Sequence, residues 1–252
     1  MSDYDRNVAA RGFGAARATA IDAGLRAYMI RVYNYMAAGV ALTGVVAWIT
    51  FNAAVVTDAA GRITSLTPFG QAIFSGPLAI VLFLGTLGLV FFMSFRINSL
   101  QPSTALMLFM LYAGLLGLML SSVFLAYTGA SITRTFFISA ASFGALSIYG
   151  YTTQRDLSPV GSFLIMGLFG IILAMIVNMF LKSTGLDFAI SVIGVLIFAG
   201  LTAWDTQRIK EMYSANDDGT ISGRKAVMGA LALYLDFINL FLFLLRFLGD
   251  RR

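Results

Sequence analysis

The chain has 252 residues, of which 17 are basic and 12 acidic, so charged residues make up only 12% of it. A soluble domain carries about 25% charged residues, whereas here hydrophobic residues reach 59% and the mean hydropathy is +0.85. Such a chain cannot cover its surface with polar groups, which excludes a water-soluble fold and predicts contact with a lipid bilayer. The net charge of +5 is small, and no nucleic-acid partner is expected.

Two residue types are missing from the sequence, cysteine and histidine. Without cysteine there is no disulfide and no thiolate nucleophile or metal ligand. Without histidine the chain lacks the usual acid–base group at neutral pH and the commonest metal ligand. These absences exclude Ser–His hydrolases, histidine-ligated haem and histidine-bound zinc. Since no phosphate-binding glycine loop or redox motif is present either, we expect neither an enzyme nor a cofactor.

Seven apolar stretches are long enough to cross a membrane, which takes about 20 residues. Only the seventh contains charged residues, Asp236 and Arg246. The pattern predicts an all-α polytopic membrane protein, a seven-helix bundle with the C-terminal helix central. Three prolines fall at predicted helix starts, where a missing N–H costs nothing, and Pro68 is placed in the first loop. The predicted spans are Tyr33–Phe51, Ser75–Phe95, Thr104–Leu125, Thr135–Thr152, Pro159–Leu181, Phe188–Trp204 and Val227–Phe247.

Basic residues are distributed unevenly between the predicted loops. We divide the chain into a basic cytoplasmic N-terminal tail (1–32), a seven-helix transmembrane domain (33–248) and a short C-terminal tail (249–252). With the N-terminus inside, eleven basic residues fall on inner segments and three on outer loops, as the positive-inside rule requires. Seven full crossings would then place the C-terminal arginines outside, against that rule, so a re-entrant last segment remains an alternative. The inner residues are Arg6, Arg11, Arg17, Arg26, Arg31, Arg96, Arg155, Arg208, Lys210, Arg224 and Lys225, and the outer ones are Arg62, Arg134 and Lys182.

The charged residues of the last span lie on one stripe of its helix. At 100° per residue, Gly229, Ala232, Asn239 and Arg246 fall on the side of Asp236. Ionisable residues in membrane helices face the bundle interior or a water-filled cavity, so this stripe is predicted to face other helices. Ten residues separate Asp236 from Arg246 by about 15 Å, so the two cannot pair, and Arg246 is expected to reach toward the outer surface.

Asp205, in the run Trp204-Asp205-Thr206-Gln207, ends the sixth predicted span on the inner side. The seventh span begins on that side, and Arg96 ends the second span there. Asp205 can approach Asp236 only if the sixth helix continues to about Met212 or a wet funnel reaches into the bundle. The alternative is that Asp205 and Arg208 are ordinary charges at a helix end.

Four stretches of the chain carry a resemblance to a known family. They are Arg31-Val32-Tyr33-Asn34, Ser94-Phe95-Arg96-Ile97, residues 199–207 (AGLTAWDTQ) and residues 234–241 (YLDFINLF). Together with the seven spans, they resemble the Bax inhibitor-1 family of small membrane proteins, particularly its bacterial branch. The resemblance covers residues 27–248.

The resemblance implies a pH-sensitive calcium leak channel in the bacterial inner membrane. By that resemblance, Asp205 and Asp236 share a proton and sense pH, and Arg96 pairs with Asp205. Two carboxylates in contact cannot both ionise cheaply, so they titrate as a unit. The same carboxylates are predicted to contact calcium, with Asn239, Arg246 and Thr202 lining or supporting the pore.

One position departs from the family pattern. The resemblance matches Arg246 to an arginine whose acidic partner lies in the second helix, but the span Ser75–Phe95 contains no acidic residue. This departure puts a second ion-pair latch on the outer side in doubt.

A second interpretation makes the chain an interaction protein without transport of its own. Some members of the same family restrain a membrane-bound protease or modulate cell death, and here the basic N-terminal tail would be the contact. A third, an intramembrane aspartyl protease, fits two aspartates on adjacent helices. It lacks the Gly-x-Gly-Asp and Pro-Ala-Leu sequences of those enzymes.

Overall fold

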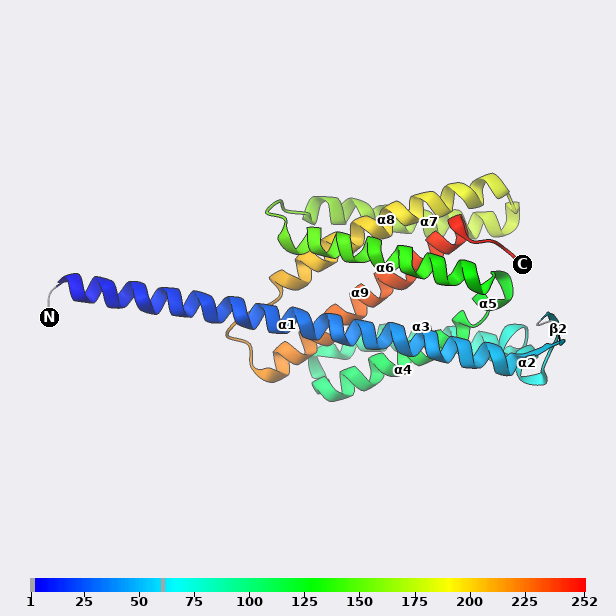
Figure 1. Ribbon diagram of the computed structural model, residues 1–252, viewed down its shortest axis with the longest axis horizontal. Coiled ribbons are helices and arrows are strands. Elements are labelled where there is room, and N and C mark those ends of the chain that lie inside the picture. Colours follow the sequence, from blue (N-terminus) through cyan, green and yellow to red (C-terminus); the bar gives the residue numbers. More distant parts are fainter. Residues whose placement is uncertain (1–2, 60–61) are drawn as a thin grey trace.

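The computed structural model describes residues 3–59 and 62–252, with side chains from residue 22 onward, and the fold is all-α apart from one short hairpin (Figure 1). The described elements are α1 (Asp3–Ala54), β1 (Val55–Thr57), β2 (Ile63–Leu66), α2 (Pro68–Phe74), α3 (Pro77–Arg96), η1 (Ile97–Ser99), α4 (Pro102–Leu120), α5 (Val123–Ala126), α6 (Gly129–Thr152), α7 (Ser158–Leu181), α8 (Thr184–Glu211) and α9 (Gly219–Leu248).

Seven helices are long and apolar enough to cross a membrane, namely α1, α3, α4, α6, α7, α8 and α9. The predicted polytopic all-α fold and the order of its spans are therefore confirmed. The bounds of the sixth span matter most for the site, because it was predicted to end at Trp204 and continues as α8 to Glu211. A helix does not stop where the apolar stretch stops, because its backbone hydrogen bonds continue into the polar residues that follow.

Side-chain caps mark where helices α8 and α9 begin. Ser183 accepts a hydrogen bond from the Leu186 N–H at the start of α8, and Asp218 accepts one from the Ile221 N–H at the start of α9. Such caps satisfy N–H groups that have no partner within the helix. Pro77 and Pro102 open α3 and α4 as predicted.

The prediction that Pro68 lies in an irregular loop is wrong. Pro68 opens the short helix α2, because the Thr67 hydroxyl accepts a hydrogen bond from the Gly70 N–H and proline is well suited to the first helical position. Between α1 and α2 the chain forms the antiparallel pair β1–β2.

Helix α9 is the centre of the bundle, as predicted. Of its most apolar 18-residue stretch 72% is buried, against 11% for α3 and for α7. It packs directly against α1, α4, α6 and α8, while α3 packs on α4 and α7 on α8. Four helices thus pack directly on α9, and α3 and α7 form an outer layer.

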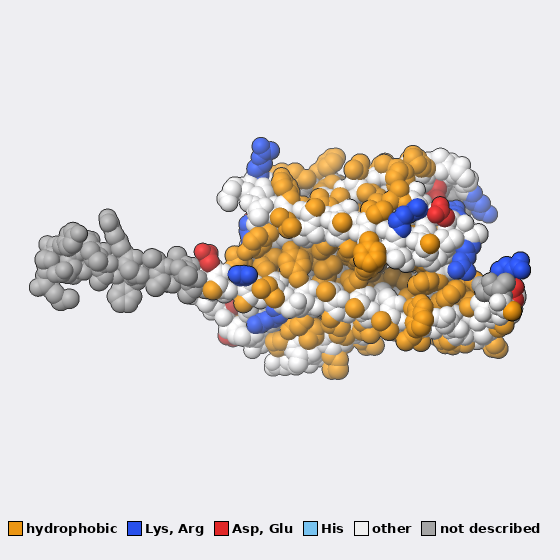
Figure 2. All heavy atoms as spheres, viewed as in Figure 1, with side chains coloured by type: hydrophobic (Ala, Val, Ile, Leu, Met, Phe, Trp, Pro, Cys, Tyr) orange, Lys and Arg blue, Asp and Glu red, His pale blue; other side chains and the backbone are white. Residues whose placement is uncertain are grey.

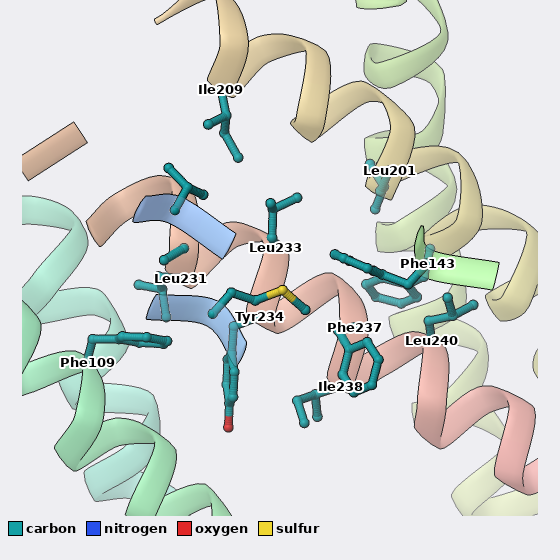
Figure 3. Close-up of a cluster of buried hydrophobic side chains, with 14 of the residues drawn as sticks. Phe109, Phe143, Leu201, Ile209, Leu231, Leu233, Tyr234, Phe237, Ile238 and Leu240 are labelled. Atoms are coloured by element: carbon teal, nitrogen blue, oxygen red, sulfur yellow. The ribbon is translucent and has the colours of Figure 1, made fainter. Parts of the chain in front are cut away.

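Aromatic side chains lock α9 to its neighbours (Figure 3). Tyr234 is fully buried, with its ring edge-on to Phe109 of α4 at 5.4 Å. The Tyr234 hydroxyl lies 2.7 Å from Oγ1 of Thr43. The Thr43 hydroxyl in turn donates a hydrogen bond to the Ala113 carbonyl. One buried phenol therefore joins α9, α1 and α4 through a satisfied polar chain.

The two chain ends lie at opposite ends of the bundle (Figure 1). We call these the N-terminal end, with the α6–α7 and α8–α9 loops, and the C-terminal end, with the hairpin and residues 249–252. Helix α9 is one unbroken helix of 30 residues, which is long enough for a full crossing of a membrane.

The predicted boundary at residue 33 falls inside α1, which runs without a break from Asp3 to Ala54. Tyr28 and Val32 are already buried in the core. Of the predicted tail arginines, the side chains of Arg6, Arg11 and Arg17 lie outside the described residues.

Candidate functional site: a buried carboxyl pair

Asp236 lies in the middle of α9 with only 4% of its surface exposed. Its Oδ2 atom is buried and receives no hydrogen bond from any described donor. A mid-membrane carboxyl group costs about 2.5–3.5 kcal/mol on insertion scales. An acid in this position needs an explanation other than stability.

The carboxyl group beside Asp236 is that of Asp205. Because α8 continues to Glu211, Asp205 lies more than a turn inside the helix and faces α9, where its side chain is a hydrogen-bonding partner of Asp236. A hydrogen bond between two carboxyl groups requires a proton on one of them. The structure therefore brings together the two aspartates that the sequence singled out, close enough for a hydrogen bond when one of them carries a proton.

The nearest cation to this carboxyl pair is Arg208, one turn along α8. Its Nη1 atom lies 3.6 Å from Oδ1 of Asp205, and its guanidinium lies 5.4 Å from the centre of the Trp204 ring. Arg96, which the resemblance implied as the partner of Asp205, is exposed and joins none of the ion pairs among the described residues. The structure thus does not bring Arg96 to the pair.

The residues after Asp205 hold α8 in position. Gln207 accepts a hydrogen bond from the Leu157 N–H and donates one to the Arg155 carbonyl, both at 2.8 Å. Thr206 donates to Thr202 and contacts the Ser147 hydroxyl of α6. These contacts fix the rotation of α8 and so aim Asp205 at α9. Sequence reasoning quoted Gln207 for the resemblance but did not find this role.

Close helix packing supports the same region. A Cβ atom at Gly150 of α6 would overlap the Ala203 carbonyl, and one at Gly161 of α7 would overlap the Trp204 ring. Helix α6 therefore approaches the backbone of α8, and α7 approaches the Trp204 ring, directly before Asp205, as small residues allow in membrane bundles.

A cavity of about 650 Å³ opens beside the carboxyl pair. Asp205, Arg208, Asp236 and Asn239 supply its polar groups, and apolar side chains of α3, α7, α8 and α9 supply the rest. The predicted stripe of α9 thus faces this cavity and α8. Thr202, predicted as a supporting polar residue, is fully buried and donates to the Phe198 carbonyl of its own helix.

A second cavity of about 280 Å³ lies further toward the C-terminal end. It shares Met175, Asn239 and Phe243 with the first and is also lined by Tyr127 and Arg246. Phe243 stacks on Phe198 of α8 at 5.7 Å between ring centres. The two cavities follow α9 from the carboxyl pair to Arg246, with Phe243 and Asn239 at the boundary between them.

Arg246 has an acidic partner that sequence reasoning missed. Its Nε atom lies 3.7 Å from Oδ1 of Asp187 at the start of α8, and Nη2 of Arg251 lies 3.4 Å from Oδ2 of the same residue. The partner thus comes from the sixth span rather than the second. We call Asp187, Arg246 and Arg251 the Asp187 cluster.

The last residues of the chain are held at the same end. Nη2 of Arg134 lies 3.3 Å from Oδ2 of Asp250 and forms an ion pair with it. The Asp250 N–H donates a hydrogen bond to the Ser131 hydroxyl. The backbone of Arg251 bridges Tyr127, and the Arg252 N–H donates to the Ala126 carbonyl. Residues 249–252 are therefore an ordered closure of the C-terminal end.

The described residues contain no group of three or more acidic side chains that could hold a metal ion. The carboxyl pair alone offers at most four oxygens, whereas bound calcium takes six to eight oxygen ligands. If calcium reaches Asp205 and Asp236, as predicted, water or other oxygens must supply at least two of its ligands.

Comparisons with known proteins agree with the resemblance. The family model described as "Inhibitor of apoptosis-promoting Bax1" matches residues 25–252. Protein RP147 of Rickettsia prowazekii is 48% identical over all of both chains. The inner membrane protein YbhL of Escherichia coli K12 is 47% identical over 91% of this chain and 94% of its own. Protein YrjE of Lactococcus lactis is 40% identical over 90% and 92%.

Proposed function

The chain belongs to the Bax inhibitor-1 family of polytopic membrane proteins, and we propose that it is a calcium leak channel whose conductance changes with pH. The observation that carries the proposal is the contact between the carboxyl groups of Asp205 and Asp236 beside a cavity in the bundle. No catalytic activity is part of this proposal.

The proton shared by the two aspartates is the proposed switch. When it is present, a hydrogen bond joins α8 to α9; when it leaves, two negative charges face each other and the attraction of Asp205 for Arg208 increases. Gain or loss of one proton therefore changes the contact between the central helix and its main neighbour. Such a two-state contact is the element that pH can bias.

Calcium is the proposed cargo because two aspartates face the cavity. Asp236 and Asn239 face the cavity from α9, and Asp205 faces it from α8. A site with few protein oxygens binds calcium weakly, which suits passage rather than storage, since conduction requires that an ion leave as readily as it enters.

The proposed location is a bacterial inner membrane with the N-terminus in the cytoplasm. The printed name of the Escherichia coli relative supports the location, and the excess of basic residues at the N-terminal end supports the orientation. Since the chain has no cysteine, Ala9→Cys and Thr57→Cys should each give one label, from opposite sides. Labelling of both from one side would contradict the orientation.

Calcium efflux from liposomes that contain the purified protein, measured from pH 6 to 8, tests the switch. Asp205→Asn and Asp236→Asn keep the shape but remove one titrating group, so each should flatten the pH dependence of efflux. The two aspartates act as one unit, so the double variant should add little. Asp187→Asn removes a carboxylate of the same helix outside the pair and should keep the wild-type profile.

Two results would contradict the proposal. One is a wild-type protein that is folded in the liposomes and gives no calcium efflux at any pH. The other is an unchanged pH profile in both single Asn variants, which would leave Asp236 with a structural role only.

A further inference from the structure

Helices α1 and α6 run side by side along one face of the bundle without packing extensively on each other (Figure 1). Helix α1 packs on α4 and α9, and α6 packs on α8 and α9. The seam between α1 and α6 therefore has α9 as its floor. We call this seam the α1–α6 groove, and hydrophobic side chains gather along it (Figure 2).

Two hollows follow one another in this groove. The Arg26 hollow, of about 560 Å³, lies toward the N-terminal end and is lined by Arg26, Met29, Tyr33, Phe143, Gly144 and Tyr151 among others. The Trp48 hollow, of about 440 Å³, lies toward the C-terminal end and is lined by Gly44, Trp48, Phe124, Phe136, Phe237 and Phe241 among others. Arg26 and Trp48 are 22 residues apart, or about 33 Å along the helix, so together the hollows cross the membrane.

The walls of the Arg26 hollow match the hydrocarbon region of a bilayer. Ile30 and Ile148 border it with 49% and 67% of their surfaces exposed. An open apolar hollow on a lipid-facing surface is filled by lipid chains unless a protein covers it. A helix with its side chains is about 10–12 Å across, and a membrane-spanning one would need far more room than these hollows offer.

One basic residue, Arg26, lines the Arg26 hollow. Arg26 is exposed and forms no ion pair with any residue whose side chain the structure describes. The lining of the Trp48 hollow contains no charged residue. An apolar trough with a cationic residue at one end is complementary to a phospholipid with an anionic headgroup.

We propose that the Arg26 hollow is a binding site for one anionic phospholipid, whose acyl chain lies between α1 and α6 and whose phosphate faces Arg26. This site is separate from the carboxyl pair, and its test uses no calcium measurement. It therefore stands or fails independently of the proposed leak.

Two glycines allow each hollow to be filled in turn. A Cβ atom at Gly144 in the Arg26 hollow, or at Gly44 in the Trp48 hollow, would meet no other atom within 4 Å. Gly144→Leu should therefore occupy the proposed site without a clash, and Gly44→Leu is its matched control. Leucine also favours the helix more than glycine does, so both variants are expected to fold.

The experiment is native mass spectrometry of the full chain in neutral detergent, titrated with phosphatidylglycerol or with phosphatidylcholine of the same acyl chains. Wild type should retain one phosphatidylglycerol in preference to phosphatidylcholine, and Gly144→Leu should lose that preference while Gly44→Leu keeps it. Arg26→Gln should weaken phosphatidylglycerol retention about fivefold and leave phosphatidylcholine unchanged, since it removes one cation near an anionic surface.

Three outcomes would overturn the proposal. The first is equal retention of both lipids by wild type, and the second is displacement by Gly44→Leu instead of Gly144→Leu. The third is a dimer or a co-purified protein that Gly144→Leu disrupts, which would make the groove a docking site for another helix. Should Gly144→Leu fail to fold, the charge dependence measured with Arg26→Gln still decides.

Discussion

Helices α8 and α9 meet at two places where acidic and basic side chains gather, and the two places differ. At the carboxyl pair, Asp205 and Asp236 face each other with 13% and 4% of their surfaces exposed, and the one close cation, Arg208, pairs with Asp205. In the Asp187 cluster, a single aspartate lies between two arginines with 31% of its side chain exposed. The acid of the exposed cluster thus has basic partners, whereas the buried Asp236 faces another acid.

This difference distinguishes charged groups that fit a structural role from charged groups that do not. Exposed ion pairs contribute about 0–1 kcal/mol each, and the Asp187 cluster fits the role of closing the C-terminal end. A buried acid next to another acid does not help stability, and the proposed proton switch would account for its presence. The neighbouring polar side chains of α8, Thr206 and Gln207, have hydrogen-bond partners, whereas the buried Oδ2 atom of Asp236 has none among the described residues.

The largest expected effect comes from breaking the packing that places α8 at the carboxyl pair. Gly150→Ala puts a Cβ atom against the Ala203 carbonyl, two residues from Asp205, and should lower the free energy of unfolding by about 1–3 kcal/mol. Gly144→Ala, on the same helix but facing open space, should be neutral or stabilising by up to about 1 kcal/mol. Thermal unfolding in detergent, followed by circular dichroism, measures both; equal losses would contradict the packing argument.

A smaller effect distinguishes the two arginines that could balance the pair. Arg208→Gln removes the cation at 3.6 Å from Asp205 and should move the midpoint of the calcium-efflux profile to higher pH, because the ionised pair loses its counter-charge. The side chain of Arg208 is 59% exposed, so solvent screening should limit the shift to less than about one pH unit. Arg96→Gln should shift the midpoint less; the reverse order would favour the pairing that the resemblance implied.

The sequence was sufficient to predict the features that depend on one helix alone. The seven spans follow from apolar runs, and the stripe of Asp236 and Asn239 follows from helical periodicity. The contact with Asp205 depended on a helix that continues past its apolar run. The sequence made such a continuation plausible, because Trp204-Asp205-Thr206-Gln207 leads into polar residues with good helix propensity. Whether the helix continues depends on its packing in the fold.

The missed features depend on which helices become neighbours. Asp187 lies 59 residues before Arg246, and nothing in either local pattern says that α8 begins where α9 ends. The α1–α6 groove was equally hidden, because each helix shows only its own apolar surface. Arg208 was visible as a helix-end charge, whereas Arg96 was chosen through the resemblance, and the structure leaves Arg96 exposed.

The smallest expected effect concerns the Asp187 cluster. Asp187→Asn leaves Arg246 and Arg251 without their shared anion, yet all three side chains are partly exposed. The free energy of unfolding should therefore fall by only about 1 kcal/mol, and the loss should shrink at high ionic strength because salt screens exposed charges. A double-mutant cycle with Arg251→Gln, measured by thermal unfolding at two salt concentrations, gives the coupling between the two residues. A salt-independent loss above about 3 kcal/mol would mean that this cluster behaves as a buried pair, and the contrast with Asp205 and Asp236 would disappear.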